Sequence, residues 1–256
     1  MTLHTHWPAE SIWEAVSPWL PDFTVEVLPE IDSTNTELMR RSRAGHTEPT
    51  LLVAEHQSAG RGRQGRQWIN TPGDALMFSI SMPYTPQDWS GLSLVVGLVL
   101  AQQLHPEVGL KWPNDLWWQD RKMGGILVEA ASTGSRSQLV VGAGINIRPL
   151  RHSEPLRNPS AALQELRPDI TAPQALEQVA PALIRALLDF KTQGFAPWQR
   201  IFDQRDVLKG RPIWTSDGKQ GRSLGVDAQG ALRLETEHGV ELINSAEVSV
   251  RPHPFV

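Results

Sequence analysis

The chain has 256 residues, of which 40% are apolar and 20% are charged, and its formal net charge is −4. This composition excludes a mainly disordered chain and predicts one large globular domain, or a large domain with a small companion. The acidic balance provides no general basic surface for nucleic acid or an anionic membrane, and the lack of cysteine excludes disulfides, thiolate metal sites and a cysteine nucleophile.

Helical and strand-like patterns alternate along most of the chain, which predicts a mixed α/β body. In chain order, the predicted elements are a helix at 11–20, a strand at 25–28 that ends at Pro29, strands at 50–56 and 76–82, a buried helix at 92–104, strands at 126–130 and 139–147, and an amphipathic helix at 176–187. The segment Thr34-Asn35-Thr36-Glu37 has the spacing of a capping box, so a further helix is expected to begin there.

The pattern changes near residue 210 to short apolar pieces separated by turns. The pieces lie at 213–215, 232–234, 240–242 and 248–250, and glycine-containing turn pairs stand between them. Such close spacing predicts a small all-β unit. We therefore expect one domain at residues 1–208 and a smaller one at residues 209–256.

A loop rich in glycine and arginine follows the strand predicted at 50–56. Its sequence Gly60-Arg61-Gly62-Arg63-Gln64-Gly65-Arg66 matches the G-x-G-x-x-G fingerprint of dinucleotide sites. That fingerprint must open a helix, whereas Asn70-Thr71-Pro72-Gly73 is turn material, and the Gly-Lys-Ser/Thr ending of a P-loop is missing. Two interpretations remain, a loop that binds carboxylate or phosphate oxygens and a solvated basic turn.

Lys111 and two groups of glycines are further candidates for contact with a ligand. Lys111 follows a short apolar approach and precedes Trp112-Pro113-Asn114-Asp115, so it is expected at a strand end, where ligands bind in α/β proteins. Taken alone, it would more often be a surface lysine. Gly142 and Gly144 interrupt a predicted strand, and Gly124-Gly125 directly precedes another, which indicates either a bulge or a close approach of a ligand. The eight histidines show no metal-ligand spacing, so the sequence assigns no metal ligands.

Five segments together resemble the biotin protein ligases in order and approximate spacing. They are Ser33-Thr34-Asn35, the stretch from Glu55 to Trp68, Lys111 to Leu116, Arg121 to Glu129, and Gly142 to Asn146. The resemblance covers residues from about 25 to 250 and implies an α+β fold, with a mixed-sheet catalytic domain of the biotin/lipoate ligase type and a small C-terminal SH3-like β-barrel. Because about 25 residues precede the core, a helix-turn-helix domain is not expected, so the resemblance implies the monofunctional type without specific DNA binding.

The resemblance implies ATP-dependent attachment of biotin to a lysine of a biotin carboxyl carrier protein, through biotinyl-5'-AMP. It assigns Lys111, Arg63 and Arg61 to catalysis, and Mg²⁺ is expected with ATP. The expected biotin-binding residues are Ser33, Thr34, Asn35, Gln57, Gly60, Arg61, Gly62, Arg63, Lys111, Gly125, Gly142 and Gly144. The expected ATP-binding residues are Arg66, Trp68, Lys111, Asn114, Lys122 and Asn146, with Arg251 as a further candidate.

Two other functions compete with this interpretation. A lipoate or octanoate ligase or transferase has a related fold, but its Arg-Arg and triple-glycine stretch is missing here. A binding protein for biotin or a nucleotide, without turnover, is the non-enzymatic alternative. We expect a cytoplasmic protein, since the sequence shows neither a secretory signal nor a membrane span, and the resemblance leaves monomer and homodimer both open.

Overall fold

A computed structural model describes residues 5–68, 71, 73–133, 136–149, 159–244 and 250–252. Its α-helices are α1 (Ala9–Val16), α2 (Thr34–Arg43), α3 (Leu92–Leu104), α4 (Ala172–Gln193) and α5 (Gln199–Asp203), and its 3-10 turns are η1 (Arg63–Gly65), η2 (Leu163–Glu165) and η3 (Ala196–Trp198). Within these residues, no helix is both long and apolar enough to cross a membrane.

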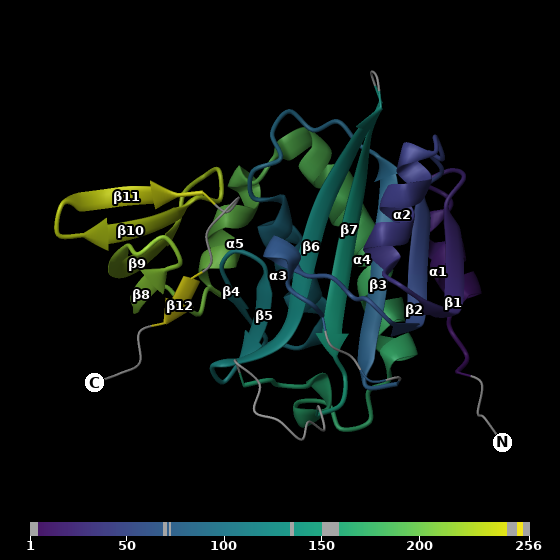
Figure 1. Ribbon diagram of the computed structural model, residues 1–256, viewed down its shortest axis with the longest axis horizontal. Coiled ribbons are helices and arrows are strands. Elements are labelled where there is room, and N and C mark those ends of the chain that lie inside the picture. The colour runs from purple at the N-terminus through teal and green to yellow at the C-terminus, as the bar shows by residue number, and fades with distance from the viewer. Residues whose placement is uncertain are drawn as a thin grey trace.

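A seven-stranded mixed sheet forms the body of the protein (Figure 1). Its strands are β1 (Thr24–Ile31), β2 (Thr50–Gln57), β3 (Ala75–Pro83), β4 (Gly109–Lys111), β5 (Asp115–Trp118), β6 (Arg121–Thr133) and β7 (Arg136–Asn146). They lie in the order β1-β2-β3-β7-β6-β5-β4, with β1 and β2 parallel and the other neighbours antiparallel. This arrangement confirms the predicted mixed α/β body.

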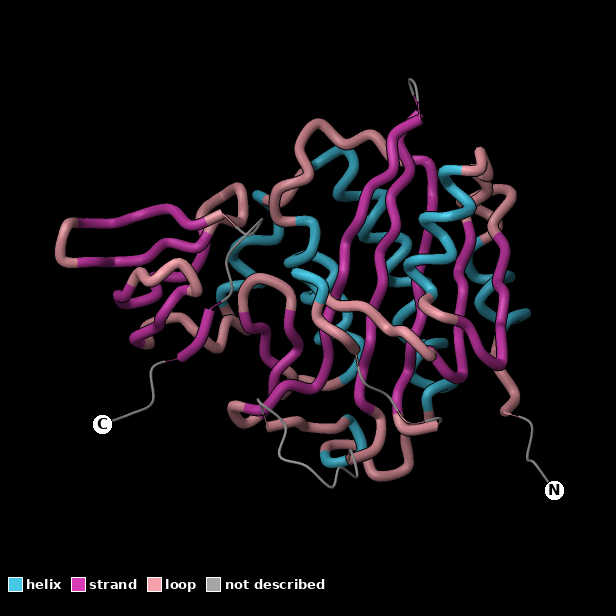
Figure 2. The backbone as a smooth tube through the Cα atoms, in the orientation of Figure 1, coloured by secondary structure: helices cyan, strands magenta, loops and turns pink. Residues whose placement is uncertain are grey.

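The two faces of this sheet are covered differently (Figure 2). One face carries the main hydrophobic core, to which α1, α3 and α4 contribute. The apolar run that predicted a helix at 92–104 forms α3 over those same residues, and ten of its residues are buried. On the opposite face, α2 is the helix among the described residues that packs on the sheet, with a small cluster around Leu38, Leu52 and Val140, and a cavity opens beside it.

Two of the predicted strand boundaries were wrong. The strand predicted at 25–28 does not end at Pro29, because β1 continues to Ile31. Pro29 is tolerated because β1 is an edge strand, where a missing backbone N–H need not break the sheet. The strand predicted at 126–130 is the middle of β6, which begins at Arg121.

A five-stranded antiparallel sheet follows α5. It comprises β8 (Pro212–Thr215), β9 (Gln220–Val226), β10 (Leu232–Thr236), β11 (Gly239–Ile243) and β12 (Val250–Pro252), in the order β11-β10-β9-β8-β12. The predicted strand at 248–250 lies partly outside the described residues, and β9 was not predicted. The Trp112 Nε1 donates a hydrogen bond to the carbonyl of Gly230 at 3.1 Å, which joins this sheet to the loop that follows Lys111.

Candidate active site

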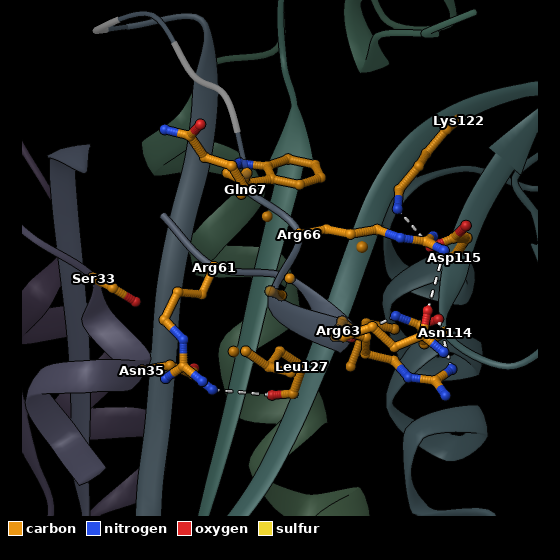
Figure 3. Close-up of a pocket in the computed structure, with 18 of the residues that line it drawn as sticks. Ser33, Asn35, Arg61, Arg63, Arg66, Gln67, Asn114, Asp115, Lys122 and Leu127 are labelled. Atoms are coloured by element: carbon orange, nitrogen blue, oxygen red, sulfur yellow. Dashed lines mark hydrogen bonds and ion pairs between the residues drawn. The ribbon is translucent and has the colours of Figure 1, made fainter. Parts of the chain in front are cut away.

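A cavity of about 510 Å³ opens on the face of the large sheet that α2 partly covers. The start of α2, the end of β2, the Arg/Gly loop (residues 60–68), the β4–β5 hairpin, strands β6 and β7, and β12 all contribute to its wall. In Figure 3, Ser33 and Asn35 lie on one side of it, and Asn114, Asp115 and Lys122 on the other. Segments from distant parts of the sequence therefore meet in one place.

Two glycines on β7 lower the floor of the cavity. Gly142 and Gly144 alternate on the cavity face, where register places them opposite Leu127 and Gly125 of β6. A Cβ atom on Gly142 would overlap Oδ1 of Asn35, and one on Gly144 would lie 2.5 Å from the ring of Trp68. The pairing of β7 with both neighbours is unbroken here, so the glycines mark a close approach and not a bulge.

The α2 side of the cavity carries neutral hydrogen-bonding groups. Ser33 caps α2 by accepting from the backbone N–H of Thr36. The helix begins at the predicted corner, but its cap is Ser33 and not Thr34, the first residue of the predicted capping box. The backbone N–H and the hydroxyl of Thr34 donate to Oε1 of Gln57 at 2.7 and 3.1 Å. Thr34, Asn35 and Gln57 are all buried. Such a cluster of hydroxyl and amide groups suits a neutral ring that both donates and accepts hydrogen bonds.

The Arg/Gly loop bends back on itself at the mouth of the cavity. Arg61 and Gln67 form an isolated antiparallel bridge, and η1 lies between them as one turn. At the end of the loop, Trp68 packs its ring over Gly144, and its Nε1 is buried without a hydrogen-bond partner among the described residues. The loop thus opens no regular helix, in agreement with the rejection of the dinucleotide fingerprint.

Two lysines share one carboxylate at the far end. The Nζ atoms of Lys122 and Lys111 lie 2.6 and 3.6 Å from the carboxylate oxygens of Asp115. The Lys122 side chain is 31% exposed, whereas that of Lys111 is 12% exposed and its Nζ lies 4.9 Å from the centre of the Trp117 ring. Burial lowers the pKa of Lys111, and Asp115 opposes that shift. Both lysines line the cavity, so their amino groups can face an anion bound there.

Two arginines of the loop reach opposite sides of the cavity. Arg63 donates to Oδ1 of Asn114 at 3.3 Å, and burial lowers the pKa of its guanidinium. Arg61 lies 3.1 Å from Glu129 on β6, beside Asn35. The loop therefore places the Arg61 guanidinium near Asn35 and the Arg63 guanidinium near Asn114 (Figure 3).

Two predicted nucleotide-binding residues make scaffold contacts. The side-chain amide of Asn146 donates to the carbonyls of Ala161 and Lys122 at 3.1 and 3.4 Å. That of Asn114 donates to the carbonyl of Ile126 at 2.7 Å. Each also lines the cavity, so a direct contact with the nucleotide stays a prediction.

The cavity wall contains every site residue that was predicted from the sequence except Gly60. The predicted residues in the wall are Ser33, Thr34, Asn35, Gln57, Arg61, Gly62, Arg63, Arg66, Trp68, Lys111, Asn114, Lys122, Gly125, Gly142, Gly144, Asn146 and Arg251. A Cβ atom on Gly60 would lie 2.7 Å from the carbonyl oxygen of Trp68, so that glycine lets the two ends of the loop approach each other.

No role in the site was predicted from the sequence for Asp115, Glu129 or Ser79. Asp115 stands in the segment that was singled out around Lys111, but only the hairpin shows that it faces both lysines. Glu129 lies two and four residues beyond Leu127 and Gly125 on β6, so strand alternation was a signal that it shares the cavity face. Ser79 carried no such signal, because its contacts with Thr34 and Asn35 depend on where α2 packs.

Comparisons with known proteins agree with this architecture. The biotin/lipoate A/B protein ligase family model matches residues 27–146, and the biotin protein ligase C terminal domain model matches residues 216–251. The chain is 38% identical over 240 residues to the bifunctional ligase/repressor BirA of Escherichia coli (strain K12), covering 89% of this chain and 74% of that protein.

Two further relatives resemble the chain over nearly their whole length. The biotin–[acetyl-CoA-carboxylase] ligase of Paracoccus denitrificans is 31% identical, with 87% of this chain and 98% of that protein covered. The structure of the biotin protein ligase from Aquifex aeolicus in complex with biotin and ATP has a TM-score of 0.78 at 28% identity, covering 90% of this chain and 99% of that one. These matches confirm the resemblance drawn from the sequence and the fold that it implied, and the chain belongs to the biotin protein ligase family.

Proposed function

We propose that this protein activates biotin with ATP and transfers the biotinyl group to a lysine of a biotin carboxyl carrier protein, such as the acetyl-CoA carboxylase subunit. The observation that carries the proposal is a single cavity with neutral amide and hydroxyl groups at one end and two lysines at the other. A neutral ring with a carboxylate tail fits that polarity. Family membership and relatives that bind biotin and ATP support the same reaction.

The first step brings two anions together, and the cations of the cavity would offset their repulsion. An oxygen of the biotin carboxylate attacks the α-phosphorus of ATP, pyrophosphate leaves with the electrons of the broken P–O bond, and biotinyl-AMP forms. We assign Lys111 and Lys122 to the oxygens on which negative charge builds up at the reacting centre. Arg63 and Arg66 would hold the phosphates, because guanidinium groups match phosphate oxygens.

The second step needs water to be kept away from a reactive mixed anhydride. The amine of the carrier lysine attacks the biotinyl carbonyl, AMP leaves, and the amine loses a proton as the amide forms. The Arg/Gly loop lies at the mouth of the cavity, and we propose that it closes over the adenylate until the carrier arrives. Trp68, which already packs over Gly144, would form the roof above the nucleotide.

Mg²⁺ is expected to enter with the phosphates of ATP. Within the described part of the chain, no cluster of three or more histidine and acidic side chains could hold a metal ion. Asp115 is the carboxylate in the described cavity wall, and it already contacts both lysines. The residues present therefore fit a metal that the nucleotide carries, and not a site built by the protein alone.

The test is the acid-dependent exchange of labelled pyrophosphate into ATP, with biotin, lipoate and octanoate supplied separately. We expect exchange with biotin only, followed by label transfer to a biotin carboxyl carrier domain. Exchange with lipoate or octanoate would move the protein to the related ligases, and no exchange with any acid would favour the binding protein without turnover. We propose a cytoplasmic location, because the reaction consumes ATP and acts on a carrier protein.

A further inference from the structure

Glu129 connects two parts of the cavity that are distant in sequence. Its carboxylate lies on β6 and is 21% exposed. One oxygen accepts from Nη2 of Arg61 at 3.1 Å, and the other accepts from the side-chain amide of Asn35 at 3.0 Å. One carboxylate therefore holds the beginning of the Arg/Gly loop and the first turn of α2 at the same time.

The contacts continue from Asn35 into the neutral end of the cavity. Oδ1 of Asn35 lies 2.6 Å from the hydroxyl of Ser79, which lies 2.7 Å from the hydroxyl of Thr34. Thr34 in turn donates to Gln57 through its backbone and its hydroxyl. Each of these four side chains is buried, so the path is fixed by packing as well as by hydrogen bonds.

Stability alone is a weak reason for this arrangement. Arg61 is 45% exposed, and exposed ion pairs contribute little to the stability of a fold because water and salt screen them. A carboxylate that accepts one hydrogen bond on each oxygen does, however, fix the direction of both donors. The geometry is therefore suited to positioning Arg61 relative to Asn35.

We propose that Glu129 is a positioning residue that couples the acid-binding end of the cavity to closure of the Arg/Gly loop. A ligand that contacts Thr34 and Gln57 is linked through Ser79 and Asn35 to Glu129, and Glu129 holds Arg61 at the beginning of the loop. The inference rests on the proposed function, since it assigns the acid to the α2 end. It predicts that the loop is protected when the acid is bound.

The test compares Glu129→Gln with wild type. Glutamine has the same shape and keeps an oxygen for the Asn35 amide, but it lacks the charge that attracts Arg61. Glu241→Gln is the matched control, because it removes one carboxylate from an ion pair with Lys219 in the C-terminal sheet. Two measurements are made, the KM for biotin in pyrophosphate exchange and the rate at which trypsin cuts the loop with and without saturating biotin.

For Glu129→Gln we expect about a tenfold higher KM for biotin, with kcat changed less than threefold, and about a tenfold smaller protection of the loop by biotin. If Glu129 served only the stability of the fold, a variant with a wild-type circular dichroism spectrum would keep both the wild-type KM for biotin and the wild-type protection of the loop. Glu241→Gln should match wild type in both measurements. Wild-type values in Glu129→Gln, together with normal exchange by wild type, would overturn this inference and leave the proposed function standing.

A second variant guards against misfolding of the first. Arg61→Met removes the partner of Glu129 from a largely solvent-exposed position and should lower the protection by a similar factor. In that background, Glu129→Gln should change the protection less than twofold, because the contact it weakens is already gone. Full protection in Arg61→Met, or independent effects of the two changes, would contradict the coupling. Absence of exchange in wild type with every acid would instead refute the proposed function.

Discussion

Replacement of either lysine beside Asp115 is expected to slow adenylation without unfolding the protein. An ammonium about 4 Å from a developing negative charge contributes about 4 kcal/mol at an effective dielectric constant near 20. Removal of one preorganised contact of this kind typically costs about 10²- to 10³-fold in rate. We therefore expect Lys111→Ala to lower the kcat of pyrophosphate exchange about 10²-fold, and Lys122→Ala by a similar factor, because both lysines line the cavity and contact Asp115.

The assay is pyrophosphate exchange at saturating biotin and ATP, with the melting temperature measured for each variant. Lys191→Ala is the control, since Lys191 also lies against an aromatic ring, that of Tyr84 at 6.0 Å, but on α4 and away from the cavity. The control should keep its full rate. If Lys111→Ala and Lys122→Ala both stay within threefold of wild type, the role assigned to the lysine pair is refuted.

Three further outcomes follow from single contacts. Gly144→Ala should displace the Trp68 ring and raise the KM for ATP about tenfold, and an unchanged KM would show that the ring does not roof the nucleotide. Since burial lowers the pKa of Lys111, the exchange rate should fall on the alkaline side below the ordinary lysine pKa, and Lys111→Arg should move that fall to higher pH in a pH–rate profile. Burial raises the pKa of Asp206 from 3.8 to about 6, so the unfolding free energy should fall by up to about 3 kcal/mol as the pH rises from about 4 to just above 6, a loss that urea titrations at pH 4 and 7 should find reduced in Asp206→Asn.

The local parts of this site follow from the sequence because they depend on short-range chemistry. The capping-box spacing from Thr34 to Glu37 predicts the corner that begins α2, although Ser33 is the residue that caps the helix. Paired glycines at 142 and 144 indicate a close approach on a strand. A run of apolar residues predicts both ends of α3 correctly. A helix that is apolar on every side is buried on every side, so its sequence needs no polar face. Each of these signals is complete within a few neighbouring residues.

The carboxylates are different, because their roles depend on pairing between distant segments. Asp115 faces Lys111 across a tight hairpin, where the two residues are register partners, and it meets Lys122 only because β5 pairs with β6. Glu129 meets Arg61 only where the Arg/Gly loop crosses β6. Strand register and loop path are long-range properties, so the sequence presents these two residues as ordinary acidic positions.

The two carboxylates give the cavity a defined electrostatic state before any substrate binds. Asp115 lies against two lysines and Glu129 against Arg61, so cations that would repel one another in a partly buried space are held in place. A substrate carboxylate and phosphates must then compete with side chains for the same donors. Because the cations are already oriented by these ion pairs, a substrate that supplies several anionic groups at once gains more than one with a single group. The complex that contains both biotin and ATP is therefore favoured over a complex with either substrate alone. The proposed closure of the Arg/Gly loop over the adenylate requires that both substrates are bound first.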